Sequence, residues 1–137
     1  MSLALDIFKI GSEVLTVLLK ADRTQRFEVA EHFSNLSRTF KSYPAAHRAE
    51  DRDQITFLVG KTLGLIEALR GTGIFTNVLG EDKEKRFFSS VNMVLNLKDL
   101  MATANYTEPE AGYSEIMAVA GYFEGYSESL RAQAGKL

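Results

Sequence analysis

The two histidines of the chain each stand close to carboxylates, in residues 28–32 (EVAEH) and 47–51 (HRAED). Imidazoles and carboxylates at helical spacing are the ligands of metal centres in helical proteins. Di-iron bundles use a Glu-x-x-His pair on each of two helices, and neither stretch has that order. The i, i+4 spacing of Glu28 and His32 favours instead a side-chain pair on a partly solvated helix face. His47 falls in an expected connector, where we expect an exposed ring. We therefore expect no metal and no cofactor.

No other arrangement of residues predicts an enzyme. Gly71-Thr-Gly73 lacks the preceding strand and the third glycine of a phosphate-binding loop, and it is typical of a helix end. Ser89 and Ser90 have no histidine in prospect as a general base. The residues after His32 lack the lysine and glycine that follow the phosphorylated histidine in helical phosphotransfer modules. The absence of cysteine excludes disulfides, thiolate metal sites and thiol catalysis. We expect a protein without enzymatic activity.

The composition is that of a soluble globular chain. Hydrophobic residues make up 45% and charged residues 25% of the 137 residues, which predicts a single domain over residues 1–137. The net charge of −2 and the lack of a basic stripe give no support for nucleic-acid binding. A chain without cysteine fits a reducing compartment, and we expect a cytoplasmic location.

The first helical stretch, residues 3–19, is apolar enough to raise the question of targeting. Asp6, Lys9 and Glu13 interrupt it, whereas a bilayer span needs about 20 nearly uncharged residues. It also lacks the basic start and small-residue cleavage site of a signal peptide. Its wide apolar face, which includes Val17, predicts a central and heavily buried helix.

Apolar residues recur at a period close to 3.6 along nearly the whole chain, and alternation of period two is missing. The expected helices cover residues 3–19, 24–43, 55–69, 82–103 and a stretch from 107 onward, with a short helical piece at 74–79. Short connections between long amphipathic helices indicate antiparallel neighbours. The predicted fold is all-α, an up-and-down bundle of four to five amphipathic helices.

Three local signals set the expected helix boundaries. Pro44 should end the second helix, because the residue before proline is pushed out of the α region. Residues 21–23 contain no helix breaker, so the first two helices could be nearly continuous. Thr107 and Glu110 have the spacing of a capping box, which predicts Thr107 as the N-cap of the last helix.

The last helix carries a ridge of small side chains, Ser114, Ala118, Gly121 and Gly125, on the side opposite its apolar stripe. Each glycine in an exposed helix interior lowers helix stability by about 1 kcal/mol relative to alanine. We therefore expect another interaction to offset this loss. The close approach of another backbone would supply it. Either the chain's own helices cover the ridge, or a partner or second copy does, unless the glycines are simply tolerated. With the flanking Tyr122, these residues are the candidate interface.

Residues 22–43 (DRTQRFEVAEHFSNLSRTFKSY), followed by a proline-containing break and a helix that ends at Gly71, resemble part of a known class of domain. They are similar to the small helical effector-associated modules at the ends of bacterial multidomain signalling proteins, beside proteases and nucleotide-binding switch domains. The resemblance implies a recruitment module that pairs with another helical domain and has no chemistry of its own. It assigns no role to any individual residue.

The sequence thus predicts a non-enzymatic helical domain for protein–protein interaction or self-association in bacterial intracellular signalling. Its partner would be another protein or a second copy, bound through helix–helix contacts. One alternative is a membrane-acting bundle that inserts its apolar N-terminal helix, although acidic residues there balance the lysines and leave no basic face for anionic lipid. The other alternative is a metal- or small-ligand-binding bundle, which rests only on the histidine clusters.

Overall fold

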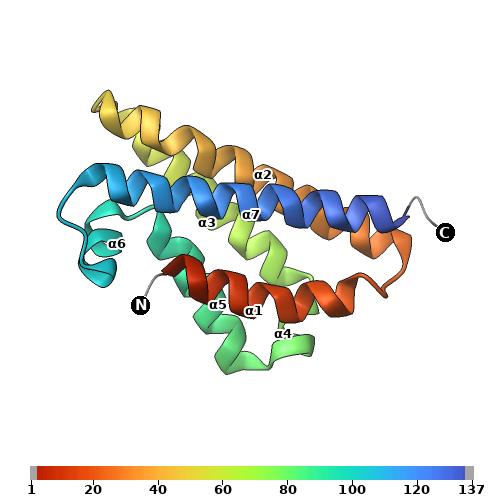
Figure 1. Cartoon of the computed structure of the whole chain (residues 1–137). Helices are drawn as coiled ribbons and strands as arrows, with labels where there is room; N and C mark the ends of the chain where they lie inside the picture. Colours follow the sequence, from red (N-terminus) through yellow and green to blue (C-terminus); the bar gives the residue numbers. More distant parts are fainter. Residues whose placement is uncertain (1–2, 135–137) are drawn as a thin grey trace.

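The computed structural model describes residues 3–134, and this part of the chain consists of helices joined by short turns, without strands (Figure 1). Its helices are α1 (Leu3–Leu18), α2 (Arg23–Arg48), α3 (Arg52–Gly71), α4 (Ile74–Leu79), α5 (Glu81–Val94), α6 (Leu97–Ala104) and α7 (Pro109–Ala134). The all-α prediction is confirmed. The described residues form seven helices where four to five were expected, and several helix boundaries differ from the expected ones. Within the described range, no helix is both long and apolar enough to cross a bilayer.

The two longest helices, α2 and α7, lie side by side and antiparallel in the middle of the molecule (Figure 1). Two buried hydroxyls connect them. Ser37 Oγ donates to the Ala120 carbonyl at 2.7 Å, and Ser127 Oγ donates to the Ala30 carbonyl at 2.8 Å. Because each hydroxyl reaches the backbone of the opposite helix, the two bonds together fix the register between α2 and α7.

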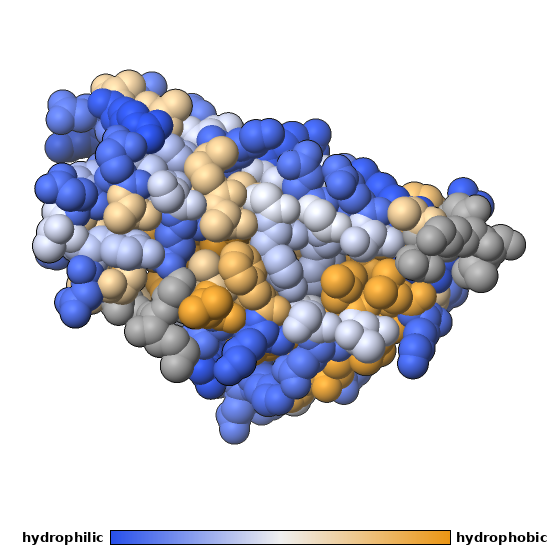
Figure 2. Space-filling model, viewed as in Figure 1, coloured by the Kyte–Doolittle hydropathy of each residue, from blue (hydrophilic) through white to orange (hydrophobic). Residues whose placement is uncertain are grey.

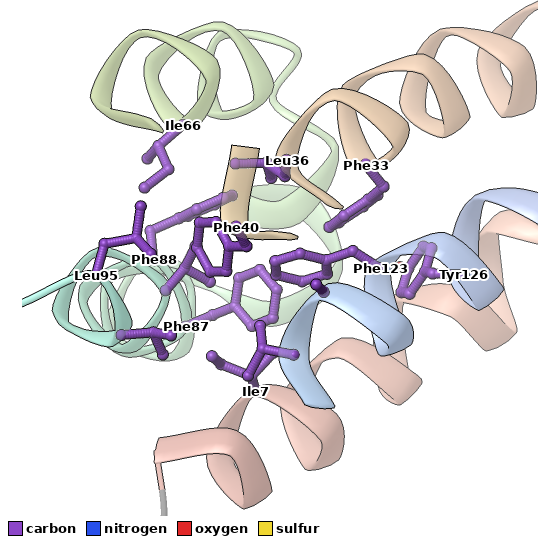
Figure 3. Close-up of a cluster of buried hydrophobic side chains, with 14 of the residues drawn as sticks. Ile7, Phe33, Leu36, Phe40, Ile66, Phe87, Phe88, Leu95, Phe123 and Tyr126 are labelled. Carbon is purple, nitrogen blue, oxygen red and sulfur yellow. The ribbon is translucent and has the colours of Figure 1, made fainter. Parts of the chain in front are cut away.

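The remaining helices cover this central pair. α3 packs on α2, and α1 packs on α7 and α5. Aromatic side chains fill the space between them, as Figure 3 shows for Phe40, Phe87 and Phe123. The ring centroids of Phe40 and Phe123 are 5.6 Å apart, an edge-to-face contact that joins α2 to α7. Most residues of the hydrophobic stripes that the helical periodicity predicts for these helices are therefore buried.

Helix α1 lies at the edge of the molecule, not at its centre. Ile7 and Val14 are fully buried against α5 and α7, whereas Leu5 and Val17 are 56% and 49% exposed. The expectation that Val17 continues the buried stripe is wrong. From Val14 the stripe steps by four residues to Leu18, which is buried, because 3.6 residues per turn bring that position back to the same face.

The chain reverses direction between α1 and α2, so these helices are not continuous (Figure 1). Asp22 caps α2, its carboxylate accepting from the backbone N–H of Gln25 at 2.8 Å. Arg26 then closes the turn from the other side, since its Nη1 donates to the Ala21 carbonyl at 2.6 Å. The turn is held by side chains without proline or glycine, which explains why no breaker marks it.

Pro44 does not end α2, which continues to Arg48. An internal proline removes one backbone hydrogen bond and costs about 3 kcal/mol or more in an ordinary helix. Here Pro44 itself is buried, as are Tyr43 before it and Ala46 two residues after it, which are only 3% and 7% exposed. Packing of these residues into the core offsets the lost bond and keeps the chain helical.

The expected helix at 82–103 is divided into α5 and α6. The break falls at Asn96, whose side chain accepts from the Asp99 N–H at 3.3 Å and so starts a new helix. The start of the last helix also differs, because α7 begins at Pro109. Glu110, the expected capping-box partner of Thr107, instead pairs with Arg48 of α2.

Two expected boundaries are confirmed. The short piece at 74–79 is α4, with the same limits. The third helix ends at Gly71, and Gly73 follows with φ at 73°, a left-handed conformation that glycine adopts without strain.

Candidate contact surface on helix α7

The ridge of small residues lies on the outer face of α7. Ser114, Ala118, Gly121 and Gly125 are all exposed. A Cβ atom built on Gly121 or Gly125 meets no heavy atom within 4 Å. The chain's own helices therefore do not cover the ridge, and that interpretation of the glycines is wrong. In Figure 2 the middle of α7 is pale and weakly polar, and hydrophobic side chains appear beside it over α1.

Tyr122 does not share this exposure. Its ring packs 4.7 Å from Phe8 of α1, and its hydroxyl donates to the Phe8 carbonyl at 3.4 Å. Burial raises the pKa of Tyr122 to about 12. The close approach between helices occurs here, at Gly11, where a Cβ would lie 2.7 Å from Tyr122 Oη. Tyr122 thus belongs to the packing of α7 on α1 and only borders the exposed ridge.

A groove between α2 and α7 adjoins the N-terminal end of the ridge. Its lining consists of Lys41, Pro44, Ala45 and Arg48 from α2 and Tyr113, Ser114 and Met117 from α7. Met117 is 41% exposed and gives the groove an apolar wall. The exposed Lys41 makes no ion pair within the described part of the chain, so its ammonium group is free to meet an acidic partner.

Arg48 at the end of this groove is already engaged. Its guanidinium lies 4.5 Å from the centre of the Tyr113 ring, and its Nη2 donates to Glu110 Oε2 at 2.9 Å. The hydrogen bond from Arg48 lowers the pKa of Glu110 below its usual value. Both charges are open to solvent, so this pair contributes little to stability. Its effect is to hold the start of α7 against the end of α2.

The C-terminal half of the same face is acidic. Glu124 and Glu128 are exposed, and neither forms an ion pair with another described residue. The neighbouring basic residue, Arg131, pairs with Glu31 of α2 at 2.8 Å. Among residues 3–134, the outer face of α7 therefore runs from a lysine without an ion-pair partner beside Met117, across two uncovered glycines, to two carboxylates without one.

The histidines do not form a metal centre. His47 lies in the last turn of α2, partly buried, with Nδ1 2.5 Å from the Tyr113 hydroxyl oxygen, so the expectation of an exposed connector residue is wrong. His32 is partly buried and Glu28 exposed, far along α2 from His47. Among residues 3–134, no group of three or more histidine, aspartate and glutamate side chains is placed to hold a metal ion.

Within residues 3–134, three charged residues, Arg26, Glu84 and Glu115, are buried although none of them was expected in the core, and the first two join helices. Arg26, 1% exposed, holds the end of α1 as described above. Glu84 is 3% exposed and forms an ion pair with Arg70 that joins α5 to α3. The burial of Arg26 could have been predicted from its spacing, because it lies one turn before Val29 and Ala30 on the buried stripe of α2. Arg26 and Glu84 serve the packing of helices, and neither faces the α7 surface.

Comparisons of the whole chain with protein-family models, with curated proteins and with solved structures gave no significant match.

Proposed function

We propose that this chain is a non-enzymatic interaction domain that binds another helix on the outer face of α7. The observation that carries the proposal is the groove lined by Lys41, Tyr113 and Met117, which adjoins the open space above Gly121 and Gly125. The open glycines alone do not distinguish this face, because Gly60 and Gly64 of α3 are equally open. Glycine in an exposed helix interior costs about 1 kcal/mol relative to alanine, and the fold of the chain gains nothing from it at these positions. A second helix packed against the ridge supplies the missing benefit, because its backbone approaches closely where no side chain intervenes.

The surroundings of the ridge support the same proposal. Protein contact sites commonly join an apolar centre to a polar rim, and methionine is enriched in them. Met117 supplies exposed apolar surface beside the small residues, and Lys41, Glu124 and Glu128 supply charges at its edges that no other described residue pairs. The cellular setting that we propose, recruitment in bacterial intracellular signalling in the cytoplasm, rests only on the resemblance of residues 22–71 to effector-associated modules.

Site-specific photo-crosslinking in cells tests the proposal. A photo-crosslinking amino acid in place of Met117, beside the ridge, should give covalent adducts with a bound protein, because the probe replaces a long side chain and leaves the open glycines unchanged. Leu63 on α3 is a matched control position, because it is also a hydrophobic residue of similar exposure, 44% against 41% for Met117. Adducts at position 117 that are absent at position 63 support the proposal. Their absence at 117, or equal labelling at both positions, would overturn it.

A second measurement uses side-chain size. Gly125→Leu should reduce the adducts formed at position 117, because the added side chain holds the two helices apart. Gly64→Leu on α3 adds the same side chain at another open, exposed glycine and should leave them unchanged. Thermal melts of both variants check that each remains folded.

A further inference from the structure

The free charges on the α7 face have opposite signs on either side of Gly121. Lys41 of α2 lies beside Met117 at one end, and Glu124 and Glu128 lie at the other end. The register of the two helices fixes this arrangement. Ser37 bonds to Ala120, and Lys41 lies one turn further along α2, which brings it level with the turn of α7 that contains Met117. A face with separate positive and negative ends is complementary to itself when one copy is turned end to end.

We infer that the partner of this face is a second copy of the chain, with the two α7 helices antiparallel and crossing at Gly121. The inference rests on the proposed function and names its partner. Closed twofold dimers are the commonest assemblies of identical chains, and their interface uses the same patch on both copies. With the axis at Gly121, the Lys41 of each copy faces the Glu124 and Glu128 of the other.

The spacing of side chains along α7 matches this axis. Met117 and Gly125 lie equally far from Gly121 in opposite directions, so the exposed Met117 of one copy enters the open space above the other's Gly125. Ser114 and Glu128 are related in the same way, which lets the hydroxyl of one copy donate to the carboxylate of the other. Met117 thus meets a glycine that leaves room for it, and Ser114 meets a carboxylate that can accept its hydrogen bond.

The sides of the helix also match. A twofold axis perpendicular to both helices places each flank of α7 against the same flank of the other copy. α2 runs along the flank that contains Ala120 and Ser127. At roughly 100° per residue, Glu124 lies only about 40° around the helix from Ala120, on the α2 side of the ridge. The carboxylates therefore face the edge of the second copy on which Lys41 lies.

The expected dimer is weak and exchanges with monomer. Specific interfaces of standard size bury about 800 Å² per partner. A contact made by one pair of crossing helices and the neighbouring edges of α2 falls at the small end of that class. Sedimentation velocity of the full chain over a wide concentration range should show a dimer that dissociates on dilution. Added salt should weaken it, because exposed ion pairs are screened.

Charge reversal identifies the contacts. Lys41→Glu should weaken self-association about tenfold, because the substitution replaces an attraction by a repulsion. A twofold dimer contains this contact two times, so the effect on the association free energy is doubled. The double variant Glu124→Lys with Glu128→Lys should do the same. A mixture of the two variants should associate again as a heterodimer, since every contact then joins opposite charges. Lys61→Glu, an exposed reversal on α3, is the control and should leave the wild-type dimer intact.

Several results would overturn the inference. A wild type that stays monomeric at every concentration excludes the second copy, and so does a dimer that survives both reversals. Reversed variants that remain separate when mixed exclude this arrangement of charges. These results leave the proposed function testable on its own, because adducts at position 117 with a different protein would retain helix binding and reject only self-association. Circular dichroism and thermal melts confirm that the variants compared are folded.

Discussion

The Ser37 hydroxyl reaches the carbonyl of Ala120 across 2.7 Å, and this bond sets the register on which the α7 surface depends. It lies in the buried seam between α2 and α7, where Ser127 makes the reciprocal bond to Ala30 at 2.8 Å. The same register brings Lys41 beside Met117. A slip of one turn between the helices would separate the lysine from the ridge, so these two serines position the charges of the proposed contact.

Ser37→Ala should lower the free energy of unfolding by about 1 kcal/mol, the usual net value of one buried hydrogen bond. Ser42→Ala is the control, because the exposed Ser42 hydroxyl bonds only within its own helix, to the Arg38 carbonyl. Its effect should stay within about 0.5 kcal/mol. Urea unfolding of both variants measures the difference. Equal effects would mean that the bond between the helices contributes nothing to stability.

Substitution of Arg26 should lower the free energy of unfolding more than substitution of any other charged residue in the turn between α1 and α2. Arg26→Met keeps the apolar stem and removes the donor to the Ala21 carbonyl, and it should cost about 1.5–3 kcal/mol, as hydrogen bonds from charged groups do. Arg26→Lys retains a charged donor and should cost less. Chemical denaturation ranks the two variants, and a Met variant as stable as the wild type would contradict the capping role.

Local sequence patterns predict the helices of this protein better than they predict its turns. The stripe of Val29, Phe33 and Phe40 is fully buried, as its spacing indicates. The turn before α2 was missed although Asp22 and Gln25 have the spacing of a capping box, because no glycine or proline drew attention to it. Pro44 predicts the end of a helix, but α2 continues past it, because tertiary packing overrides the local preference of proline.

The same limit applies to the α7 surface. The ridge of small residues follows from spacing within one helix, and its exposure was one of the alternatives that the sequence left open. The placement of Lys41 beside it could not be read from the sequence, because it depends on the register between two helices far apart in the chain. Likewise, the contact of His47 with Tyr113 joins the end of α2 to the start of α7.

The two histidines should differ in their effect on stability. His32→Gln should change the free energy of unfolding by less than about 0.5 kcal/mol. His47→Gln should cost about 0.5–1.5 kcal/mol, because it disturbs the bond to the Tyr113 hydroxyl. Most of that cost should disappear when His47→Gln is made in a Tyr113→Phe background. Iron, manganese or zinc that survives dialysis in stoichiometric amount would contradict both this account and the expected absence of a metal.

Alkaline pH should unfold the protein through its buried tyrosines. Burial raises the pKa of Tyr122 to about 12 in the folded chain, against about 10 when unfolded. Between these values the folded state keeps a proton that the unfolded state has lost, so stability is intact below pH 10 and falls as the pH rises toward 12. Tyr122→Phe should move the midpoint of alkaline unfolding upward. An unchanged midpoint would assign the effect to Tyr43 and Tyr126, whose pKa values burial also raises.

Two glycines should respond to alanine with opposite signs. At Gly121 a Cβ meets open space, so Gly121→Ala should stabilise the monomer by about 1 kcal/mol through helix propensity alone. At Gly11 the Cβ would lie 2.7 Å from Tyr122 Oη and 3.2 Å from its ring, so Gly11→Ala should destabilise by about 1–3 kcal/mol. Tyr122 is held against Phe8 and cannot move aside freely.

The cause at Gly11 can be isolated with a double-mutant cycle. Removing the hydroxyl with Tyr122→Phe takes away the nearest atom, so Gly11→Ala should cost clearly less in that background than in the wild type. Thermal melts at a concentration where the protein is monomeric give all the values. If Gly11→Ala costs the same in both backgrounds, the hydroxyl contact is not the source of the loss. If Gly121→Ala destabilises the monomer, the space above the ridge is not open, and the proposed contact on α7 loses part of its support.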